Sequence, residues 1–301
     1  MEGLIIKLIS GEYTCLLENK EIRICKPIGI FRLNKEEPKV GDKVIVEDNS
    51  IVKLLTRKND LIRPNVSNVD KAFIITSLVE PDLNLNLLDR LIASIEYNNI
   101  DIVLAFSKAD LVKDIKTYDN IFNYYKDLGY HTYLLPNEKE ELKLEFKDSI
   151  SVLVGQSGVG KSTMLNYFCD LNLKTDAISK ALGRGKHTTR HVELLEICDG
   201  FVADTPGFGS LDLEMDEISL AHNFREFFKC KCKFNGCLHL NEPGCMVKEK
   251  VENKEILKSR YDNYLVFINE IRQKREKGYK EASFSTKGYH SKKSNEKDKK
   301  K

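Results

Sequence analysis

The feature that most constrains this chain is the segment Gly155-Gln-Ser-Gly-Val-Gly-Lys-Ser-Thr163. Its spacing of Gly, Lys and Ser is that of a phosphate-binding loop, whose backbone N–H groups surround the phosphates of a nucleotide. The apolar residues 150–154 predict a buried strand before it, and residues 161–168 predict a helix whose N-terminus favours an anion. A Gly-rich turn without a ligand is the alternative. The candidate nucleotide ligands are Gly155, Gln156, Ser157, Gly158, Val159, Gly160, Lys161, Ser162 and Thr163, with Ser162 also on Mg²⁺.

A second motif, Ser107-Lys108-Ala109-Asp110, follows an apolar run at residues 101–106 that predicts a buried strand. In guanine-nucleotide proteins the corresponding Asp accepts hydrogen bonds from the guanine ring N–H and amine, and the Lys stem packs along the base. Adenine offers no such pair of donors, so Asp110 predicts GTP rather than ATP. Taken alone, the pattern also suits an Asp that caps a helix.

The order of these two motifs indicates a rearranged domain. Strands at residues 72–77 and 101–106, with a helix at residues 85–97 between them, predict a βαβ unit and a parallel sheet. Ordinary GTPases place base recognition after the phosphate loop, whereas here it comes first, so we expect a circularly permuted GTPase domain. Both motifs still lie at the carboxyl ends of parallel strands, where such sheets bind ligands. A helix at residues 115–128 and a strand at residues 130–135 lie between them, and we assign no guanine contact to the loop after Leu135.

Two segments after the phosphate loop have the character of GTPase switches. Residues 183–191 are basic and Gly-containing, and a hydroxyl or carbonyl of Thr188 or Thr189 would bind Mg²⁺ and sense the γ-phosphate. A polar loop without a ligand is the alternative. Further on, Asp204-Thr-Pro-Gly207 ends a predicted strand, with Asp204 holding Mg²⁺ through water and the N–H of Gly207 contacting the γ-phosphate.

Phe208 stands where Ras-like enzymes carry the Gln that orients the attacking water. A phenyl ring cannot hydrogen-bond to water in that way, so we expect slow intrinsic hydrolysis, with another group or a partner completing the site. His187 is a candidate for that group, although a His in such a loop can also face solvent or contact phosphate.

Residues 1–62 carry five short apolar segments separated by Gly and Asn-Ser turns, which predicts a small five-stranded barrel. An oligonucleotide-binding barrel is one of the few architectures of that size, so nucleic-acid binding here is a hypothesis by analogy. Residues 57–64 form the exit linker, in which Pro64 prevents the last strand from continuing.

Three thiolates and one imidazole lie close together near the C-terminus, in Cys232, Cys237, His239 and Cys245. This set suits a closed tetrahedral zinc site, and we expect one structural Zn²⁺ per chain. Cys230 is a competing ligand by position. A helix at residues 253–277 is expected to pack on this module. The remaining cysteines are expected to be ordinary core residues: Cys15, Cys25, Cys169 and Cys198.

The charge is uneven, because residues 271–301 contain 12 Lys and Arg against 4 Asp and Glu while the whole chain carries only +2. Residues 291–301 have nothing apolar to bury, which predicts disorder in either a solubilising tail or a tail for a polyanion. No apolar run is long enough to span a bilayer, and Met1-Glu-Gly does not begin a secretory signal, so a cytoplasmic protein without membrane contact is expected.

Taken together, the motifs resemble the circularly permuted RsgA-type GTPases, which depend on the small ribosomal subunit. The resemblance covers about residues 1–280, and it implies an enzyme whose barrel, GTPase domain and zinc module dock on that subunit late in its maturation. It favours Cys232 over Cys230 as the zinc ligand and gives His187 a role in catalysis. One departure is Ser107, where Asn is commonest, which we expect to weaken a brace to the phosphate loop. The motifs that carry the resemblance are Arg57-Lys-Asn, Arg63-Pro-x-Val-x-Asn-Val-Asp70, Ser107-Lys-x-Asp110, Gly155 to Thr163, His187-Thr-Thr, Asp204-Thr-Pro-Gly-Phe208 and the Cys232, Cys237, His239, Cys245 set.

The predicted fold class is α/β, in four parts. These are an oligonucleotide-binding β-barrel at 1–62, a circularly permuted P-loop GTPase domain at 63–211, a helical zinc-binding module at 212–281 and a basic disordered tail at 282–301. The expected function is GTP hydrolysis, slow alone and stimulated by the small ribosomal subunit and its rRNA, by a monomer that alternates between GTP and GDP. Two alternatives are a nucleotide-gated RNA-binding protein with negligible turnover and a permuted GTPase acting on a protein or membrane partner.

Overall fold

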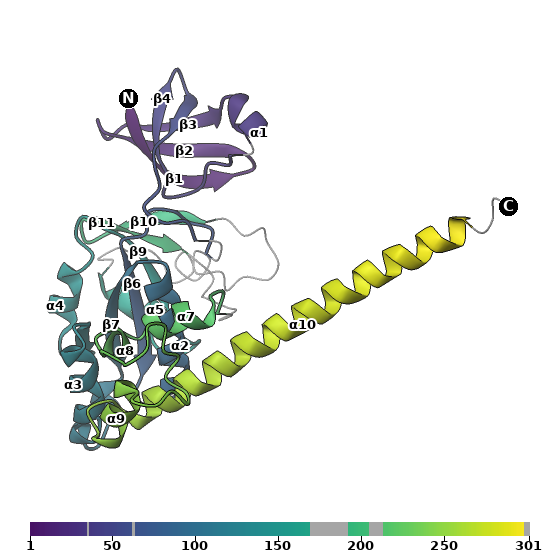
Figure 1. The fold of residues 1–301 in the computed structure, drawn as a ribbon. Helices are drawn as coiled ribbons and strands as arrows, with labels where there is room; N and C mark the ends of the chain where they lie inside the picture. Colours follow the sequence, from purple (N-terminus) through teal and green to yellow (C-terminus); the bar gives the residue numbers. More distant parts are fainter. Residues whose placement is uncertain (35, 62–63, 169–191, 205–212, 298–301) are drawn as a thin grey trace. The chain divides into compact units, whose positions relative to one another are not determined.

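The computed structural model describes residues 1–34, 36–61, 64–168, 192–204 and 213–297 (Figure 1). The chain divides into two compact units, residues 1–212 and residues 213–301. In the first unit, a barrel precedes a sheet flanked by helices. The second unit is helical, and it carries the cysteine cluster.

The N-terminal part is a closed five-stranded barrel, as the alternation of apolar residues predicts. Strand β1 pairs with both β2 and β4, and β3 pairs with β5, so the sheet closes on itself. The short helix α1 (Ile30–Asn34) lies between β3 and β4. Cys15 and Cys25 are buried in the barrel, as expected of small core residues. The barrel strands are β1 (Glu2–Ile9), β2 (Glu12–Leu17), β3 (Ile22–Pro27), β4 (Lys43–Glu47) and β5 (Ser50–Leu54).

Five parallel strands form the centre of the GTPase domain, in the order β11-β9-β6-β7-β8. A sixth strand, β10, pairs antiparallel with β11 through a turn in which Cys198 and Asp199 both have positive φ, and the sequence pattern does not predict this strand. β10 also meets the barrel, because Lys7 of β1 forms an ion pair of 2.9 Å with Glu193. The bounds are β6 (Lys71–Ser77), β7 (Asp101–Ser107), β8 (His131–Leu134), β9 (Ile150–Val154), β10 (Glu193–Ile197) and β11 (Gly200–Asp204).

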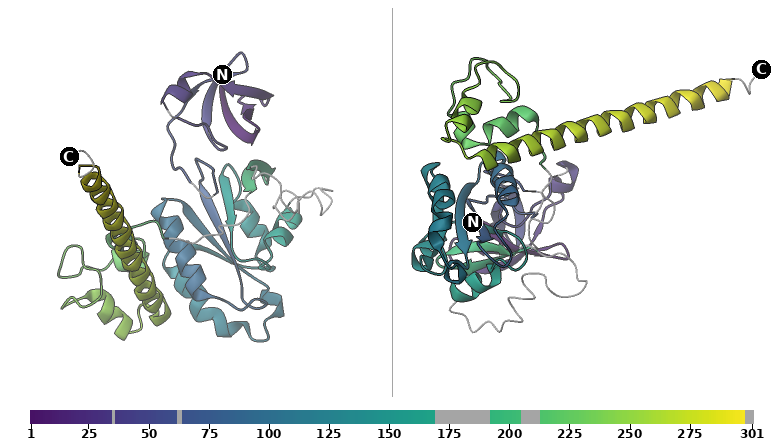
Figure 2. Two further views of the ribbon diagram at one scale, coloured as in Figure 1. Left: turned by 90° about the vertical axis from the view of Figure 1, so that its right-hand side faces the viewer. Right: turned by 90° about the horizontal axis from the view of Figure 1, so that it is seen from below.

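Helices cover both faces of this sheet (Figure 2). Side chains alternate along a strand, so Ile74 packs in the cluster that contains residues of α2 (Leu85–Tyr97), while Phe73 and Ile75 pack in the cluster with α5 (Lys161–Phe168). The helix expected at residues 115–128 begins as a 3₁₀ turn, Ile115–Tyr118, and becomes α3 only at Asp119–Asp127. The short helices η1 (Ala109–Leu111) and α4 (Lys139–Leu144) were not expected.

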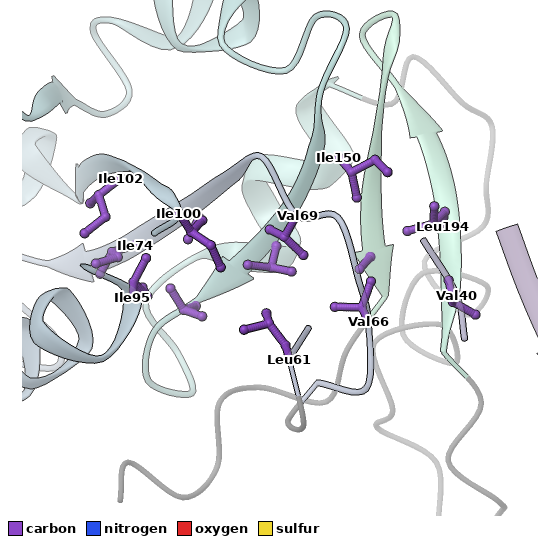
Figure 3. Close-up of a cluster of buried hydrophobic side chains, with 14 of the residues drawn as sticks. Val40, Leu61, Val66, Val69, Ile74, Ile95, Ile100, Ile102, Ile150 and Leu194 are labelled. Atoms are coloured by element: carbon purple, nitrogen blue, oxygen red, sulfur yellow. The ribbon is translucent and has the colours of Figure 1, made fainter. Parts of the chain in front are cut away.

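The apolar core is continuous from the barrel loops to the sheet (Figure 3). Val40 precedes strand β4, Leu61 lies in the linker, and Val66 and Val69 lie between the linker and β6; all four are buried. They belong to the same buried cluster as Ile150 of β9 and Leu194 of β10. The linker is therefore packed against the strand that leads into the phosphate loop.

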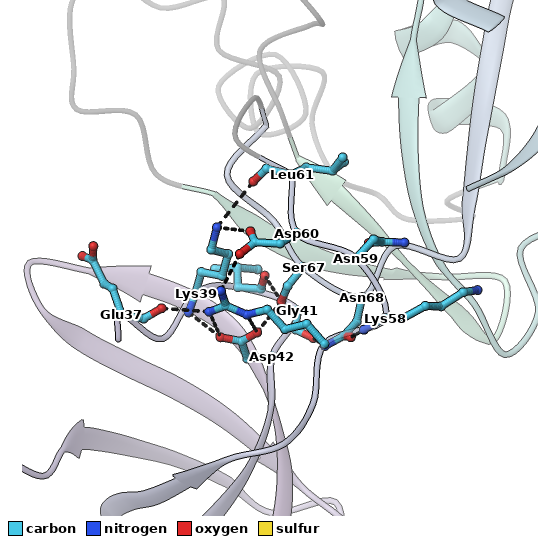
Figure 4. A network of polar contacts seen from close by, with 12 residues as sticks. Glu37, Lys39, Gly41, Asp42, Lys58, Asn59, Asp60, Leu61, Ser67 and Asn68 are labelled. Carbon is cyan, nitrogen blue, oxygen red and sulfur yellow. Dashed lines mark hydrogen bonds and ion pairs between the residues drawn. The ribbon is translucent and has the colours of Figure 1, made fainter. Parts of the chain in front are cut away.

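A set of polar contacts, which we call the Arg57 network, fastens the linker to the barrel (Figure 4). The Arg57 guanidinium donates to both carboxylate oxygens of Asp42, at 2.7 and 2.8 Å, and to Asp60 at 2.6 Å. Ser67 Oγ donates to Asp42 at 2.6 Å, and Lys39 Nζ pairs with Asp60. Asp42 is fully buried, so the guanidinium compensates a carboxylate that has lost its water.

The second unit is built from four helices among the described residues, α7 (Glu217–His222), α8 (Arg225–Phe228), α9 (Met246–Glu252) and α10 (Lys258–Lys297). Its core contains a buried ion pair, in which Arg260 Nε donates to Glu226 at 2.8 Å. None of the helices that the structure describes is both long and apolar enough to cross a membrane.

Helix α10 corrects two expectations. It begins at Lys258, five residues after the predicted start, because α9 and the turn after it occupy the preceding segment. Its backbone also continues to Lys297, through residues for which the composition predicts a disordered tail. Helix α10 begins in a segment whose Tyr264 and Phe267 are buried, so the helix is already nucleated there, and composition alone does not report where it ends.

Candidate nucleotide site and metal centre

The phosphate loop lies between β9 and α5, as its sequence predicts. Gly155 has φ +143°, and a Cβ there would lie 2.1 Å from the carbonyl oxygen of Ile75, so only glycine fits. Lys161 Nζ donates to the carbonyl oxygens of Gly155 and Gln156, at 2.7 and 2.5 Å. The ammonium group is thus held over its own loop, at the N-terminus of α5, where a phosphate would be favoured.

The base-recognition motif follows β7, two strands away from β9 at the same edge of the sheet. Lys108 has φ +60°, and Asp110 is exposed in η1. The N–H of Ala109 donates to the carbonyl oxygen of Leu135 at 3.0 Å. The loop after β8, to which we assigned no guanine contact, therefore holds the base-recognition motif through its backbone.

Ser107 joins the two motifs. Its hydroxyl, 6% exposed, donates to the carbonyl oxygen of Val159 at 2.6 Å and lies 3.4 Å from the carbonyl oxygen of Thr76. A hydroxyl has one hydrogen, and the shorter contact is the better bond. The serine therefore keeps the brace to the phosphate loop, although an Asn is the commoner residue at this position.

The loop after β6 is a part of the site that sequence reasoning missed. Lys108 Nζ contacts the carbonyl oxygen of Glu80, and Ser77 Oγ donates to the carbonyl oxygen of Pro81 at 2.6 Å. The ring of Pro81 lies 4.0 Å from the position that a Cβ of Gly158 would take. The available signal was the strand order, since β6 lies between β9 and β7 and its carboxyl end must open onto both motifs.

The predicted switch residues lie mostly outside the described residues: His187, Thr188, Thr189, Gly207 and Phe208. Asp204 ends β11, the strand next to β9, and only its backbone is described. The backbone thus brings Asp204 to the same edge as the phosphate loop. The ligand roles of these residues stay predictions.

The metal-binding set is assembled in the second unit. Ligand atoms of Cys232, Cys237, His239 and Cys245 all lie within 4.8 Å of one another. Nδ1 of His239 is 3.6 Å from Sγ of Cys232 and 3.5 Å from Sγ of Cys245. Tetrahedral zinc with Zn–S of about 2.3 Å and Zn–N of about 2.0 Å places N and S about 3.5 Å apart, so the residues fit the metal.

The backbone around His239 is held by side chains outside the ligand set. Glu242 accepts from the N–H groups of Leu238 and Leu240, at 2.8 and 2.7 Å. Tyr261 and Tyr264 of α10 donate their hydroxyls to the carbonyl oxygens of His239 and Leu238, at 2.7 and 2.6 Å. The helix predicted to pack on this module does so through these contacts.

Cys230 lies outside the cluster, and its thiol donates to the carbonyl oxygen of Glu226 at 3.2 Å. Cys230 and Cys232 were both candidate ligands, and the structure groups Cys232 with Cys237, His239 and Cys245. No sequence signal other than the family resemblance separated them.

Comparison with protein families decides which group the chain belongs to. A family model described as the RsgA GTPase matches residues 54–214, and another described as the RsgA N-terminal domain matches residues 2–51. The chain belongs to the RsgA GTPase family.

Several members of the RsgA GTPase family are similar to this chain over most of their length. The small ribosomal subunit biogenesis GTPase RsgA of Bacillus cereus (strain ATCC 10987 / NRS 248) is 45% identical, over 91% of this chain and 98% of that protein. The protein of the same name from Bacillus subtilis (strain 168) is 42% identical, over 91% and 98%.

Two solved structures share the fold. YloQ, a circularly permuted GTPase, aligns with a TM-score of 0.77 and 37% identity, over 91% of this chain and 95% of that one. YjeQ from Thermotoga maritima aligns with a TM-score of 0.78 and 33% identity, over 90% and 98%. Membership of the RsgA GTPase family and this likeness confirm the predicted α/β fold class, with its barrel and its permuted GTPase domain, and identify the chain as a GTPase.

Proposed function

We propose that this protein binds and hydrolyses GTP on the small ribosomal subunit, and that hydrolysis times a late step of subunit maturation and the release of the protein. The observation that carries the proposal is the brace from Ser107 to Val159, which joins the base-recognition motif to the phosphate loop at one edge of the sheet. Similar proteins named for small ribosomal subunit biogenesis support the choice of partner.

The proposed nucleotide ligands are those of the two motifs. Asp110 reads guanine, Lys161 contacts the β- and γ-phosphates, and Mg²⁺ is held by Ser162, Thr189 and Asp204. We propose that turnover is slow in the free protein because Phe208 cannot orient water, and that the subunit, with His187 or with its rRNA, completes the site.

The proposed metal is one structural Zn²⁺ per chain, on Cys232, Cys237, His239 and Cys245. The distances from Nδ1 of His239 to two thiols support tetrahedral coordination. Three thiolates suit zinc better than they suit the hard cations Mg²⁺ or Ca²⁺. When bound, the metal would link Cys232, the segment from Cys237 to His239, and Cys245, which is a folding role.

We further propose a cytoplasmic monomer, with a barrel at 1–62, a GTPase domain at 63–211 and a zinc module from 212. Its partner is the small subunit through rRNA, and no membrane is involved. Since the zinc module follows Asp204 closely in the chain, the γ-phosphate sensor is covalently close to a candidate RNA-binding module.

The proposal is tested by measuring GTP turnover with and without purified small subunits, alongside subunit binding in GTP-analogue and GDP states. We expect stimulated turnover and an affinity ratio of about ten between the two states, which corresponds to about 1.4 kcal/mol of coupling. ATP should not replace GTP. Equal affinities without stimulation would leave the alternative of a nucleotide-gated RNA-binding protein, which family membership does not favour.

A further inference from the structure

The zinc module carries an exposed segment that runs from the last residue of α8 into the metal cluster. From Phe228 to Phe234 the chain places three lysines between two phenylalanines, and no Asp or Glu occurs until Glu242. Phe228 is 70% exposed and Phe234 is 45% exposed. By contrast, Phe224 and Phe227 of the same unit are buried, so this module has a core that takes aromatic rings and leaves these two out.

The lysines are directed outward by the cysteines between them. Cys230 donates its thiol to the carbonyl oxygen of Glu226 at 3.2 Å, and Sγ of Cys232 lies 3.6 Å from Nδ1 of His239. Each cysteine therefore faces the module. Lys229, Lys231 and Lys233, which alternate with them, are exposed.

Both rings have fixed neighbours. The ring of Phe228 lies edge-on to His222, with centroids 5.8 Å apart. Lys233 Nζ lies 5.6 Å from the centroid of the Phe234 ring, and the carbonyl oxygen of Phe234 accepts from the N–H of Cys237, a metal-site residue, at 3.3 Å. The segment is thus positioned by the metal-site residues on one side and by α7 and α8 on the other.

We infer that Phe228, Lys229, Lys231, Lys233 and Phe234 form a binding surface for unpaired RNA, which we call the Phe-Lys surface. This inference deepens the proposed function, and it rests on that proposal for the source of the RNA. Exposed rings stack on bases that are not paired, and lysines contact the phosphates between them. Duplex RNA hides its base faces and is bound through its phosphates and its shape, so it would leave the two rings without a role.

The test uses the full-length, zinc-loaded protein and a fluorescently labelled single-stranded RNA of mixed sequence, with the same RNA annealed to its complement as the second probe. Binding is followed by fluorescence anisotropy over a range of salt concentrations. We expect Phe228→Ala and Phe234→Ala each to weaken single-strand binding about fivefold or more, with little change for the duplex. Replacing the three lysines by Gln should make the negative slope of log association constant against log salt concentration shallower by about 2.

Matched controls lie in the same unit. Ile218→Ala removes a half-exposed apolar side chain of α7, and a triple change of Lys254, Lys258 and Lys277 to Gln removes the same charge elsewhere. Both should bind single-stranded RNA more tightly than the corresponding surface variants do. Zinc content and helical circular dichroism must match the wild type in every variant.

Three results would overturn the inference. The first is that the wild type binds the single strand no more tightly than the duplex. The second is that the surface variants bind RNA like their controls. The third is that the surface variants lose subunit binding but keep RNA binding, which would indicate a protein contact. Because subunit-stimulated GTP turnover is measured separately in the wild type, failure of the Phe-Lys surface is distinguishable from failure of the proposed function.

Discussion

Ser107 Oγ donates a hydrogen bond of 2.6 Å to the carbonyl oxygen of Val159, which lies 52 residues further along the chain. The bond ties the strand end that is predicted to read the base to the loop that is predicted to hold the phosphates. Its donor is a serine in a motif where Asn is more common, so a smaller side chain makes the connection here.

Removing this hydroxyl should weaken nucleotide binding. Ser107→Ala leaves the buried carbonyl of Val159 without its partner, and one such bond is worth about 0.5–1.5 kcal/mol, so we expect the Kd for GTP to rise about three- to tenfold. Titration calorimetry with a GTP analogue measures this change in Kd. Ser107→Asn should retain most of the affinity, and Ser94→Ala on α2 is the control. An unchanged Kd in Ser107→Ala would mean that the brace does not position the site.

Asp110 should decide which base is bound. Asp110→Asn replaces an acceptor pair by an amide that can donate to a xanthine carbonyl, so it should favour xanthosine over guanosine nucleotides. Loss of a charge-assisted bond costs about 1.5–3 kcal/mol, which predicts a loss of GTP affinity of more than tenfold. Asp119→Asn, a nearby exposed carboxylate changed in the same way, should keep GTP binding. Unaltered GTP affinity in Asp110→Asn would place base recognition elsewhere.

The zinc content of variants should show which of the neighbouring residues Cys230 and Cys232 is a metal ligand. Cys237→Ser removes a thiolate from the cluster and should give protein without zinc and with an unfolded second unit, while GTP binding survives in the first unit. Cys230→Ser should keep one zinc per chain, because its thiol only donates to a carbonyl oxygen. Metal analysis of both variants and of Cys232→Ser checks this. Zinc retained in Cys232→Ser but lost in Cys230→Ser would reverse the assignment.

The Arg57 network should contribute strongly to stability. Arg57→Ala leaves the fully buried carboxylate of Asp42 without its guanidinium, which should lower the free energy of unfolding by about 3 kcal/mol. Lys58→Ala breaks an exposed pair with Asp70 and should cost less than about 1 kcal/mol. Urea unfolding measures both variants, and the addition of Asp42→Asn and of the double variant Asp42→Asn/Arg57→Ala gives the coupling energy between Arg57 and Asp42. If Arg57→Ala were no less stable than Lys58→Ala, the pair of Arg57 with the buried Asp42 would contribute no more to stability than the exposed pair of Lys58 with Asp70.

The stability of the sheet should fall in acid because of Glu145. Burial alone would raise the pKa of this carboxyl, but hydrogen bonds from Lys71 at 2.6 Å and Tyr133 at 2.7 Å and a contact with His131 outweigh burial and lower the pKa to about 2. The folded pKa lies below the ordinary value of 4.5, so this contribution is complete above about pH 4.5 and is lost as the pH falls toward 2.

Glu145→Gln should remove that pH dependence and lower the free energy of unfolding at pH 7 by about 3 kcal/mol. Denaturant unfolding between pH 2 and pH 7 measures the difference from the wild type. Glu141→Gln, an exposed neighbour, should follow the wild-type curve. If the unfolding free energy of Glu145→Gln changed with pH as steeply as that of the wild type, the contacts with Lys71 and Tyr133 would not depend on the charge of Glu145.

Much of the fold follows from local patterns. Strand β9 and helices α2 and α5 have the bounds that their apolar spacing predicts, because a buried strand and a one-sided helix each leave a short-range signature. Strand β10 was missed, since residues 193–197 mix Glu and Leu and gain their pairing only from β11 and the barrel. The tail differed because α10 begins in a packed segment and extends one hydrogen bond at a time from there, which composition does not report.

The sequence by itself determined the expected chemistry of the sites: a phosphate loop, an Asp110 predicted to read guanine, and a Cys and His set that could hold a metal. These depend on residue types within a few positions of one another. The tertiary structure decided which distant groups support them, including the bond from Ser107 to Val159, the contact of Lys108 with Glu80 and the burial of Asp42 beneath Arg57. The first two pairs form because the strand order brings separate segments to one edge of the sheet, and the third because the linker folds back on the barrel; no local preference of the chain encodes either arrangement.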